Sequence, residues 1–221
     1  MLTFPVFLAV GYSPYQANVT NAVGVFCSNL GATWSYRHEV RRSWPEARRL
    51  CIVACAGSAL GALTLLWTGA AVFAAIVPWL LAMSVVLVMV QPTLARAVRE
   101  RAGGAPHRAW VLGAALVAAV YGGYFGAAMG VLLLGVLGLF LHGTMQRTNA
   151  FKNAMAVCVN GVDLVVFGLL APVRWSGAAY LAAGTVVGGV LGAWLARRLP
   201  DRLFRLVVIA IGIAAVVSFL V

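Results

Sequence analysis

Acidic side chains are scarce in this chain of 221 residues. It has five Asp and Glu residues against 16 Lys and Arg, and charged residues make up only 10% of it. Hydrophobic residues make up 63%, and the mean hydropathy is +0.97. This composition lies outside the range of soluble globular proteins and predicts an integral membrane protein.

Catalytic and metal-binding patterns are also missing. The three His residues lie in or beside predicted loops, and neither a GxSxG nor an HExxH spacing occurs, so we expect no enzyme. Cys51 and Cys55 share a helix face, but no second Cys or His pair completes a metal site. We therefore expect no metal and no cofactor, and we interpret the four Cys residues as small buried packing residues.

Basic residues are confined to a few short segments. Nearly all Arg lie in 37–49, 92–109 and 197–205, which is typical of cytoplasmic loops under the positive-inside rule. No basic face is interleaved with aromatic residues, so nucleic-acid binding is not expected. The N-terminal stretch MLTFPVFLAVG has neither a basic region nor a clear cleavage site and is not a secretory signal. We expect a multi-pass protein of the cell (inner) membrane.

Apolar runs long enough to cross about 30 Å of hydrocarbon recur along the chain. They are 50–68, 71–90, 150–171, 176–196 and 204–221, with 17–36 as a more polar candidate whose start is marked by Pro14. The stretch 110–141 crosses once or twice, because YGGYFGAAMG at 121–130 is rich in Gly and predicts a broken or re-entrant helix. The expected fold is all-α, with seven or eight membrane segments.

Two sequence matches indicate an internal duplication. Thr20-Asn21 in YQANVTNAVGV pairs with Lys152-Asn153 in RTNAFKNAMAV at an offset of 132. GSALGA at 57–62 pairs with GGVLGA at 188–193 at an offset of 131. These matches predict two related repeats, joined by a basic cytoplasmic linker. The predicted boundaries are 1–91, 92–109 and 110–221.

The charges of equivalent loops favour repeats of inverted topology. Segment 37–49 carries five Arg, whereas its counterpart near 168–180 carries only Arg174. Conversely, 197–205 carries four Arg and its counterpart near 66–74 carries none. By the same offset the partner of 109–129 would lie before Met1, so we expect the first repeat to lack its opening helix and Gly-rich break.

These motifs resemble the sulfite exporter TauE/SafE family, also called the 4-toluene sulfonate uptake permease family. The resemblance rests on GYSPYQANVTNAVG followed by a basic loop, and on YGGYFGAAMGVLLL, RTNAFKNAMA and GGVLGAWLARRLP. It implies a two-repeat permease that moves sulfite, organosulfonates or related sulfur-containing anions by alternating access. Its partners would be a small anion and the lipid bilayer. A proton or another coupling ion, and a homo-oligomeric assembly, stay open.

One apolar helix carries an unusual set of polar residues. Lys152, Asn153, Asn160 and Asp163 fall along one side of it, and Asn149 joins them. A charge inside a span costs about 2.5–3.5 kcal/mol on insertion scales, so such residues usually face a cavity.

Lys152 is expected near the N-terminal end of this helix, where free backbone N–H groups also attract anions. We therefore predict Lys152, Asn149 and Asn153 as ligands of an oxyanion. The alternative is that Lys152 extends to the membrane interface.

Further candidates lie in the other polar helix and in the Gly-rich stretch. Asn18, Thr20 and Asn21, with Ser28 on the same face, either line the pathway opposite Lys152 or form interhelical hydrogen bonds. The glycines either expose backbone amides to the substrate or allow close helix packing; they are Gly122, Gly123 and Gly126.

Asp163 is the candidate for proton coupling, because a carboxylate within a span marks proton pathways. The resemblance assigns it no role, since Asp is unusual at this position of the family pattern. A hydroxyl partner from another helix would make it structural instead. Two other functions stay open for the whole chain: a membrane accessory or sensor subunit, and an anion channel.

Overall fold

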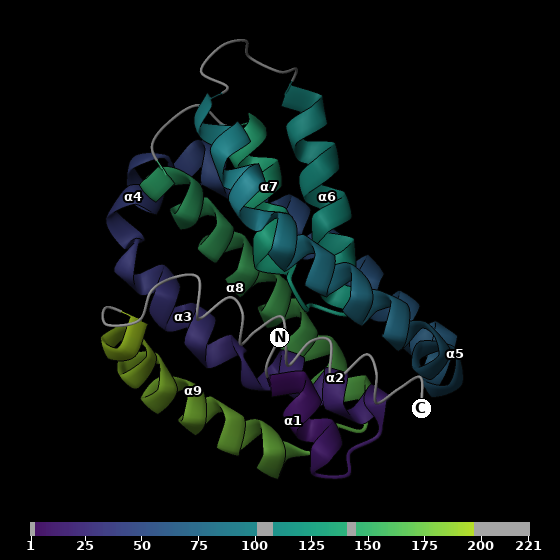
Figure 1. Ribbon diagram of the computed structural model, residues 1–221. Coiled ribbons are helices and arrows are strands. Elements are labelled where there is room, and N and C mark those ends of the chain that lie inside the picture. Colours follow the sequence, from purple (N-terminus) through teal and green to yellow (C-terminus); the bar gives the residue numbers. More distant parts are fainter. Residues whose placement is uncertain (1–2, 101–107, 141–144, 197–221) are drawn as a thin grey trace.

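The computed structural model describes residues 3–100, 108–140 and 145–196, and the regular structure in these ranges is helical (Figure 1). The all-α fold class is confirmed. In chain order the helices are α1 (Thr3–Ala9), α2 (Pro14–Gly24), α3 (Phe26–Ser35), α4 (Arg37–Arg42), α5 (Trp44–Glu100), α6 (Arg108–Tyr124), α7 (Met129–Phe140), α8 (Met145–Leu170) and α9 (Trp175–Ala196). The predicted span 204–221 lies outside the described residues.

Two of the described helices are long and apolar enough to cross a membrane. They contain the stretches Trp44–Val90, with 47 residues, and Gln146–Leu170, with 25 residues. Shorter apolar stretches occur in α6 and α7, at Ala109–Tyr124 and Met129–Gly138. These lengths fit a protein whose helices cross or enter a lipid bilayer.

The outer surface of the bundle is apolar. Large side chains that are exposed on it include Trp67, Trp79, Val117 and Leu169. Soluble proteins rarely expose many large apolar side chains over a wide area, whereas a lipid-facing surface does. The surface therefore agrees with the membrane assignment made from composition.

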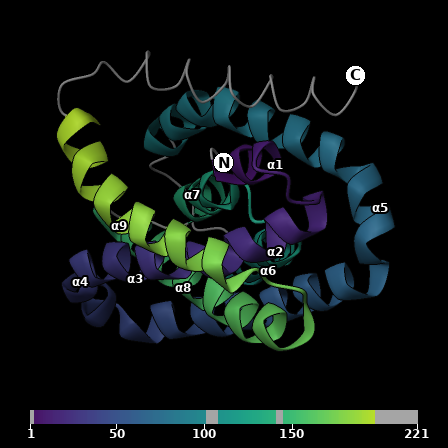
Figure 2. The same cartoon turned by 90° about the horizontal axis from the view of Figure 1, so that it is seen from below.

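Helix α5 contains two predicted spans, 50–68 and 71–90. They meet at Gly69, whose φ of 72° and ψ of −179° lie in a region that is essentially confined to glycine. The helix changes direction there, and Figure 2 shows α5 bending around one side of the molecule. It continues to Glu100, so the first part of the predicted linker 92–109 is helical.

The polar candidate 17–36 is divided into two helices. The first, α2, begins at Pro14 as predicted, and the Oγ of Ser13 accepts a hydrogen bond of 3.3 Å from the N–H of Gln16. An interruption at Val25 separates α2 from α3. The face that was predicted as one surface is therefore shared by two short helices.

The prediction of a loop over 37–49 was wrong. This segment forms α4 and the first residues of α5. It contains Arg, Glu and Ala but no Gly, so its composition is compatible with a helix as well as with a loop. Pro45 lies in the first turn of α5, where its missing N–H is tolerated.

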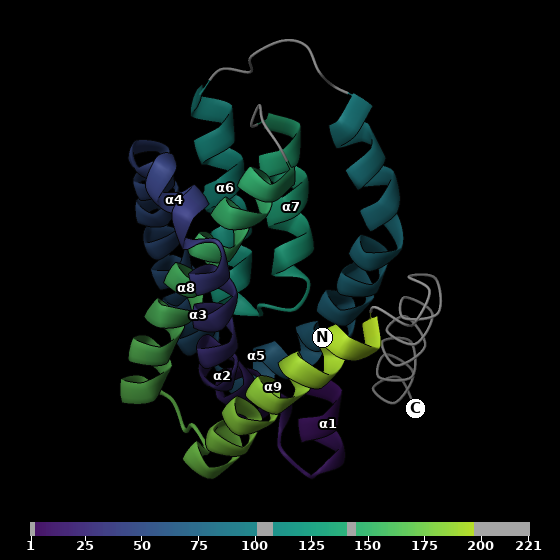
Figure 3. The ribbon, with the colours of Figure 1, turned by 90° about the vertical axis from the view of Figure 1, so that its left-hand side faces the viewer.

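The helix break predicted within 121–130 is present. The chain leaves α6, passes through 125–128 and enters α7. The φ angles of Gly126 and Ala128 in this turn are 74° and 60°. Figure 3 shows α6 and α7 side by side, joined by the turn. These two helices form a hairpin whose turn is partly buried: Phe125 and Ala127 are buried, whereas Gly126 is exposed.

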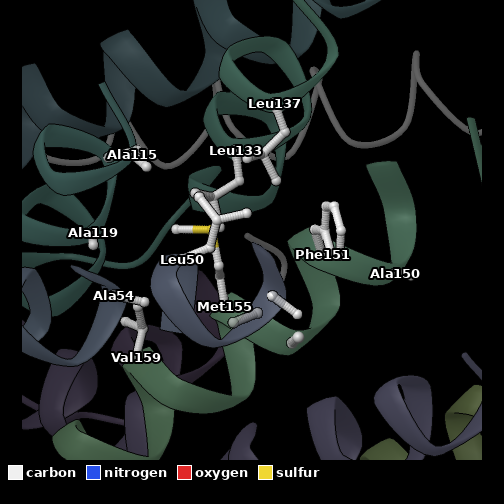
Figure 4. Packing of buried hydrophobic residues seen from close by; sticks show 14 of the residues in the cluster. Leu50, Ala54, Ala115, Ala119, Leu133, Leu137, Ala150, Phe151, Met155 and Val159 are labelled. Atoms are coloured by element: carbon white, nitrogen blue, oxygen red, sulfur yellow. The ribbon is translucent and has the colours of Figure 1, made fainter. Parts of the chain in front are cut away.

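Helix α8 is central, because α2, α3, α4, α5, α6 and α7 all pack against it. One buried apolar cluster joins α5, α6, α7 and α8 around Leu50 and Met155 (Figure 4). A second cluster joins α1, α2, α5 and α8 around Phe73 and Phe167. Both clusters hold the polar side of α8 in place.

Glycine allows α5 and α6 to approach closely. A Cβ atom on Gly61 would lie 2.1 Å from the carbonyl oxygen of Val120, and one on Gly57 would lie 2.7 Å from the Cβ of Ala119. Such backbone contact is typical of small-residue helix packing in membranes.

Candidate anion-binding site

A cavity of about 470 Å³ lies among α1, α2, α3, α7 and α8, and the turn 125–128 forms part of its wall. Its polar lining comes from two directions. Helix α8 contributes Lys152, Asn153, Asn160 and Asp163, and the α2–α3 region contributes Asn21, Ser28 and Asn29. The cavity therefore brings together polar residues that are more than 120 positions apart in the sequence.

The polar side predicted for α8 faces this cavity. All four residues of that side, from Lys152 to Asp163, line it. Asn160 is buried, and its Nδ2 donates a hydrogen bond of 2.8 Å to the carbonyl oxygen of Ala156. Lys152 is half-buried, and within the described part of the chain no carboxylate forms an ion pair with it. Its ammonium group is thus available to an anion.

The predicted position of Lys152 along its helix was wrong. Helix α8 begins at Met145, so Lys152 lies seven residues after the start, or about 10 Å along the helix axis. The free N–H groups at the start of α8 are therefore too far away to assist it.

The start of α7, rather than that of α8, lies at the cavity. Met129, Gly130 and Val131, the first residues of α7, all line the cavity. In the described chain, no backbone carbonyl accepts a hydrogen bond from the N–H groups of Ala127 and Ala128 just before α7. A helix N-terminus with free amides favours negative charge.

Asp163 is almost completely buried, with 1% of its surface exposed. Its Oδ1 lies 2.8 Å from the Oγ of Ser58 on α5, and the same Oγ lies 3.0 Å from the carbonyl oxygen of Val159. The hydroxyl partner that would give Asp163 a structural role is therefore present. Asp163 also lines the cavity, so the two roles are compatible.

Among the candidates in α2, Asn21 lines the cavity. The Oγ1 of Thr3 donates a hydrogen bond to its Oδ1. This bond fixes the orientation of the amide and leaves its Nδ2 group as a donor. Asn21 is thus suited to meet an anion from the side opposite Lys152.

Three other predicted residues are not among those that line this cavity: Asn149, Asn18 and Thr20. The Nδ2 of Asn18 donates a hydrogen bond of 2.9 Å to the carbonyl oxygen of Tyr124, and the Oγ1 of Thr20 accepts one of 3.2 Å from the N–H of Arg174. Both contacts fit the alternative of bonding between elements. The role of all three residues as ligands stays a prediction from the sequence, and the lining of this cavity does not favour it.

Of the three candidate glycines, two allow close helix packing and one lines the cavity. A Cβ on Gly122 would lie 2.2 Å from the Sδ of Met129, and one on Gly123 would lie 2.4 Å from the carbonyl oxygen of Ser58. These two positions therefore allow close packing. Gly126 lines the cavity within the turn.

Several lining residues were not predicted from the sequence. Phe4, Phe125 and Leu134 form apolar wall, and Thr3 approaches from α1. The Gly-rich stretch was the available signal for the turn, but the start of α7 as an anion-facing element was missed.

The four Cys are free thiols; Cys27 is exposed and the others are half-buried. Among the described residues, no group of three or more His, Cys, Asp or Glu side chains is arranged to hold a metal ion.

The comparisons with known proteins agree with a helical membrane fold. The model of the family described as "Sulfite exporter TauE/SafE" matches residues 1–219. No curated protein and no solved structure matches the chain significantly. The family match covers nearly the whole chain, and its members are polytopic membrane transporters. The chain therefore belongs to the sulfite exporter TauE/SafE family.

Proposed function

We propose that the chain is a permease of the cell membrane that moves sulfite, an organosulfonate or a related sulfur-containing anion by alternating access. One observation carries the proposal: Lys152, Asn21 and the first residues of α7 all line one cavity. Transport of this substrate class agrees with family membership.

The donors in the cavity suit a sulfur oxyanion. An anion that leaves water needs several hydrogen bonds and a compensating charge. Lys152 supplies the charge, Asn153 and Asn21 supply amide N–H groups, and the turn before α7 supplies backbone N–H groups. Phe4 and Phe125 line the same cavity and can contact the organic part of a sulfonate.

The packing of the helices supports two related halves, with the predicted boundaries 1–91 and 110–221. Helices α5 and α9 both begin at Trp, at Trp44 and Trp175, which is again an offset of 131 (175 minus 44). Helix α5 packs against α8 of the other half, and α9 packs against α2 and α3. Such an exchange is expected of repeats related by a two-fold axis. The proposal retains inverted repeats, seven or eight membrane segments and a homo-oligomer as predictions.

The direct test is the thermal stability of the detergent-purified protein with a panel of anions. Sulfite, methanesulfonate, taurine and sulfate would be compared with matched carboxylates. A ligand of the folded state stabilises by RT ln(1 + [L]/Kd), or about 2.7 kcal/mol at a hundredfold excess over Kd. We expect a sulfur oxyanion to stabilise the wild type and Asn149→Ala, but not Lys152→Met.

Equal stabilisation of Lys152→Met would contradict the assignment of Lys152. Proteoliposomes then separate the other functions. Counterflow of labelled substrate supports a permease, a steady anion conductance supports a channel, and binding without flux supports an accessory or sensor subunit.

A further inference from the structure

The described lining of the cavity contains one basic and one acidic side chain. Among the described lining residues, Lys152 and Asp163 are the ionisable groups with a charge near neutral pH. The permease proposal uses Lys152 but gives Asp163 no task. A carboxyl group in an anion-binding cavity would repel the substrate if it were ionised, so its protonation state matters for binding.

The hydrogen bonds around Asp163 favour its neutral form. A serine hydroxyl has one proton to donate, and a backbone carbonyl can only accept. The Oγ of Ser58 lies 3.0 Å from the carbonyl oxygen of Val159 and 2.8 Å from the Oδ1 of Asp163. If Asp163 is protonated, its O–H donates to Ser58 and Ser58 donates to Val159, so both contacts hold a proton. If Asp163 is ionised, the Ser58 hydroxyl can donate its one proton either to the Oδ1 of Asp163 or to the carbonyl oxygen of Val159, and the other contact has no proton.

No other charged group competes with Lys152 near Asp163 in the described part of the cavity. The α2–α3 region contributes uncharged Asn21, Ser28 and Asn29, and α5 contributes Ser58. The wall from the α6–α7 turn and α7 carries no ionisable side chain. The thiol of Cys158, on α8, faces Cys51 and Cys55 of α5 and is not among the lining residues.

The two protonation states differ in the charge that the cavity offers. With Asp163 neutral, the lining side chains carry +1 from Lys152; with Asp163 ionised, +1 and −1 sum to zero. A monoanion is therefore held better by the protonated site. By linkage, the bound anion must in turn favour protonation by the same factor.

We propose that Asp163 is a proton-binding site whose occupancy is coupled to that of the anion, so that one proton and one monoanion bind and leave together. This inference rests on the proposed permease function. The proton forms an O–H bond with the Asp163 carboxylate when the anion binds, and that bond breaks when both are released to the other side. A monoanion then crosses as an electroneutral pair with its proton.

The first measurement uses the wild-type protein alone. Methanesulfonate is the probe, because it keeps one negative charge between about pH 5 and pH 8, whereas sulfite titrates in this range. Its binding in weakly buffered detergent solution, followed with a pH indicator, should take up protons from solution. The Kd should rise by up to about tenfold per pH unit once Asp163 is ionised in the empty protein.

The variants then assign the proton to a residue. Asp163→Asn keeps the shape of the neutral carboxyl and can donate to Ser58, so it should bind methanesulfonate with the same Kd at every pH and without proton uptake. Asn153→Ala, a matched change on the same cavity wall, should weaken binding but keep its pH dependence.

Each outcome has a separate meaning. Binding by the wild type without proton uptake, or with a Kd that does not change with pH, would overturn the proton proposal and leave the permease proposal standing. Proton uptake that persists in Asp163→Asn would assign the proton to another group. Absence of methanesulfonate binding at every pH, together with no stabilisation of the wild type by any sulfur oxyanion of the panel, would overturn the permease proposal itself.

Discussion

The hydroxyl of Tyr121 donates a hydrogen bond of 2.7 Å to the carbonyl oxygen of Ala127. The same hydroxyl lies 2.9 Å from the Oγ of Ser84 on α5. Tyr121 lies in the last turn of α6, and Ala127 carries one of the free N–H groups beside the cavity. Tyr121 therefore ties the turn to two helices and fixes the direction of its amides, a different role from the interfacial anchoring common for membrane Tyr.

Removal of this hydroxyl should weaken anion binding. The Tyr121→Phe change deletes a bond worth about 1 kcal/mol, which corresponds to about a fivefold rise in the Kd for methanesulfonate. The matched control is Tyr124→Phe, because the hydroxyl of Tyr124 lies 3.4 Å from the Oγ1 of Thr68 on α5 and Tyr124 is not among the residues that line the cavity. Equal Kd values for the two variants would show that the turn does not contact the anion.

The two asparagines on α8 provide a second matched pair. Asn153 lines the cavity, whereas Asn149, one turn earlier, does not. A hydrogen bond to a charged group contributes about 1.5–3 kcal/mol, so Asn153→Ala should raise the Kd by about tenfold to a hundredfold. Asn149→Ala should leave the Kd unchanged. Isothermal titration of both variants checks this, and a larger loss in Asn149→Ala would place the substrate elsewhere.

The contact between α5 and α6 should be sensitive to a single methyl group. On Gly123 of α6 a Cβ would lie 2.4 Å from the carbonyl oxygen of Ser58, whereas on Gly113 of the same helix it would meet no atom within 4 Å. Overpacking costs about 1–3 kcal/mol, and Ala otherwise favours a helix over Gly. Gly123→Ala should therefore lower the unfolding temperature in detergent, and Gly113→Ala should keep or raise it. A stable Gly123→Ala variant would mean that the helices can separate at no cost.

The polar side of α8 could be predicted from the sequence because the positions of Lys152, Asn153, Asn160 and Asp163 follow directly from the helix period. The break after α6 was also predictable from its glycines. The cavity itself depends on which helices close around that side, and on a chain reversal that brings the start of α7 to it. These are tertiary relationships between segments that a local pattern does not record.

The boundaries that were wrong have a local cause. Arg-rich segments occur in loops and in helices alike, so the charges of 37–49 indicated the membrane side without indicating the conformation. The start of α8 at Met145 was missed because polar residues at 146–149 precede the apolar run, although they continue the same helix. Because α8 begins earlier than predicted, Lys152 lies farther from the start of its helix than predicted.

The distribution of Arg also predicts which end of the bundle faces the cytoplasm. Arg147 near the start of α8 forms an ion pair with Glu46 at the start of α5, so these two helix starts lie at one end. Arg37, Arg41 and Arg42 of α4 also lie near this end, since α4 packs against α8. The loop after α8 carries Arg174 alone. The positive-inside rule therefore predicts that α4 lies on the cytoplasmic side and the α8–α9 loop on the outer side.

Thiol labelling can check this orientation, because Arg41 and Ser176 are both exposed and lie towards opposite ends of α8. In a background with the four native Cys replaced, Arg41→Cys and Ser176→Cys would be treated with a membrane-impermeant maleimide in right-side-out vesicles. We expect Ser176→Cys to react at once and Arg41→Cys to react only after permeabilisation. The reverse order would invert the topology, and reaction of both in sealed vesicles would show that α8 does not cross the membrane.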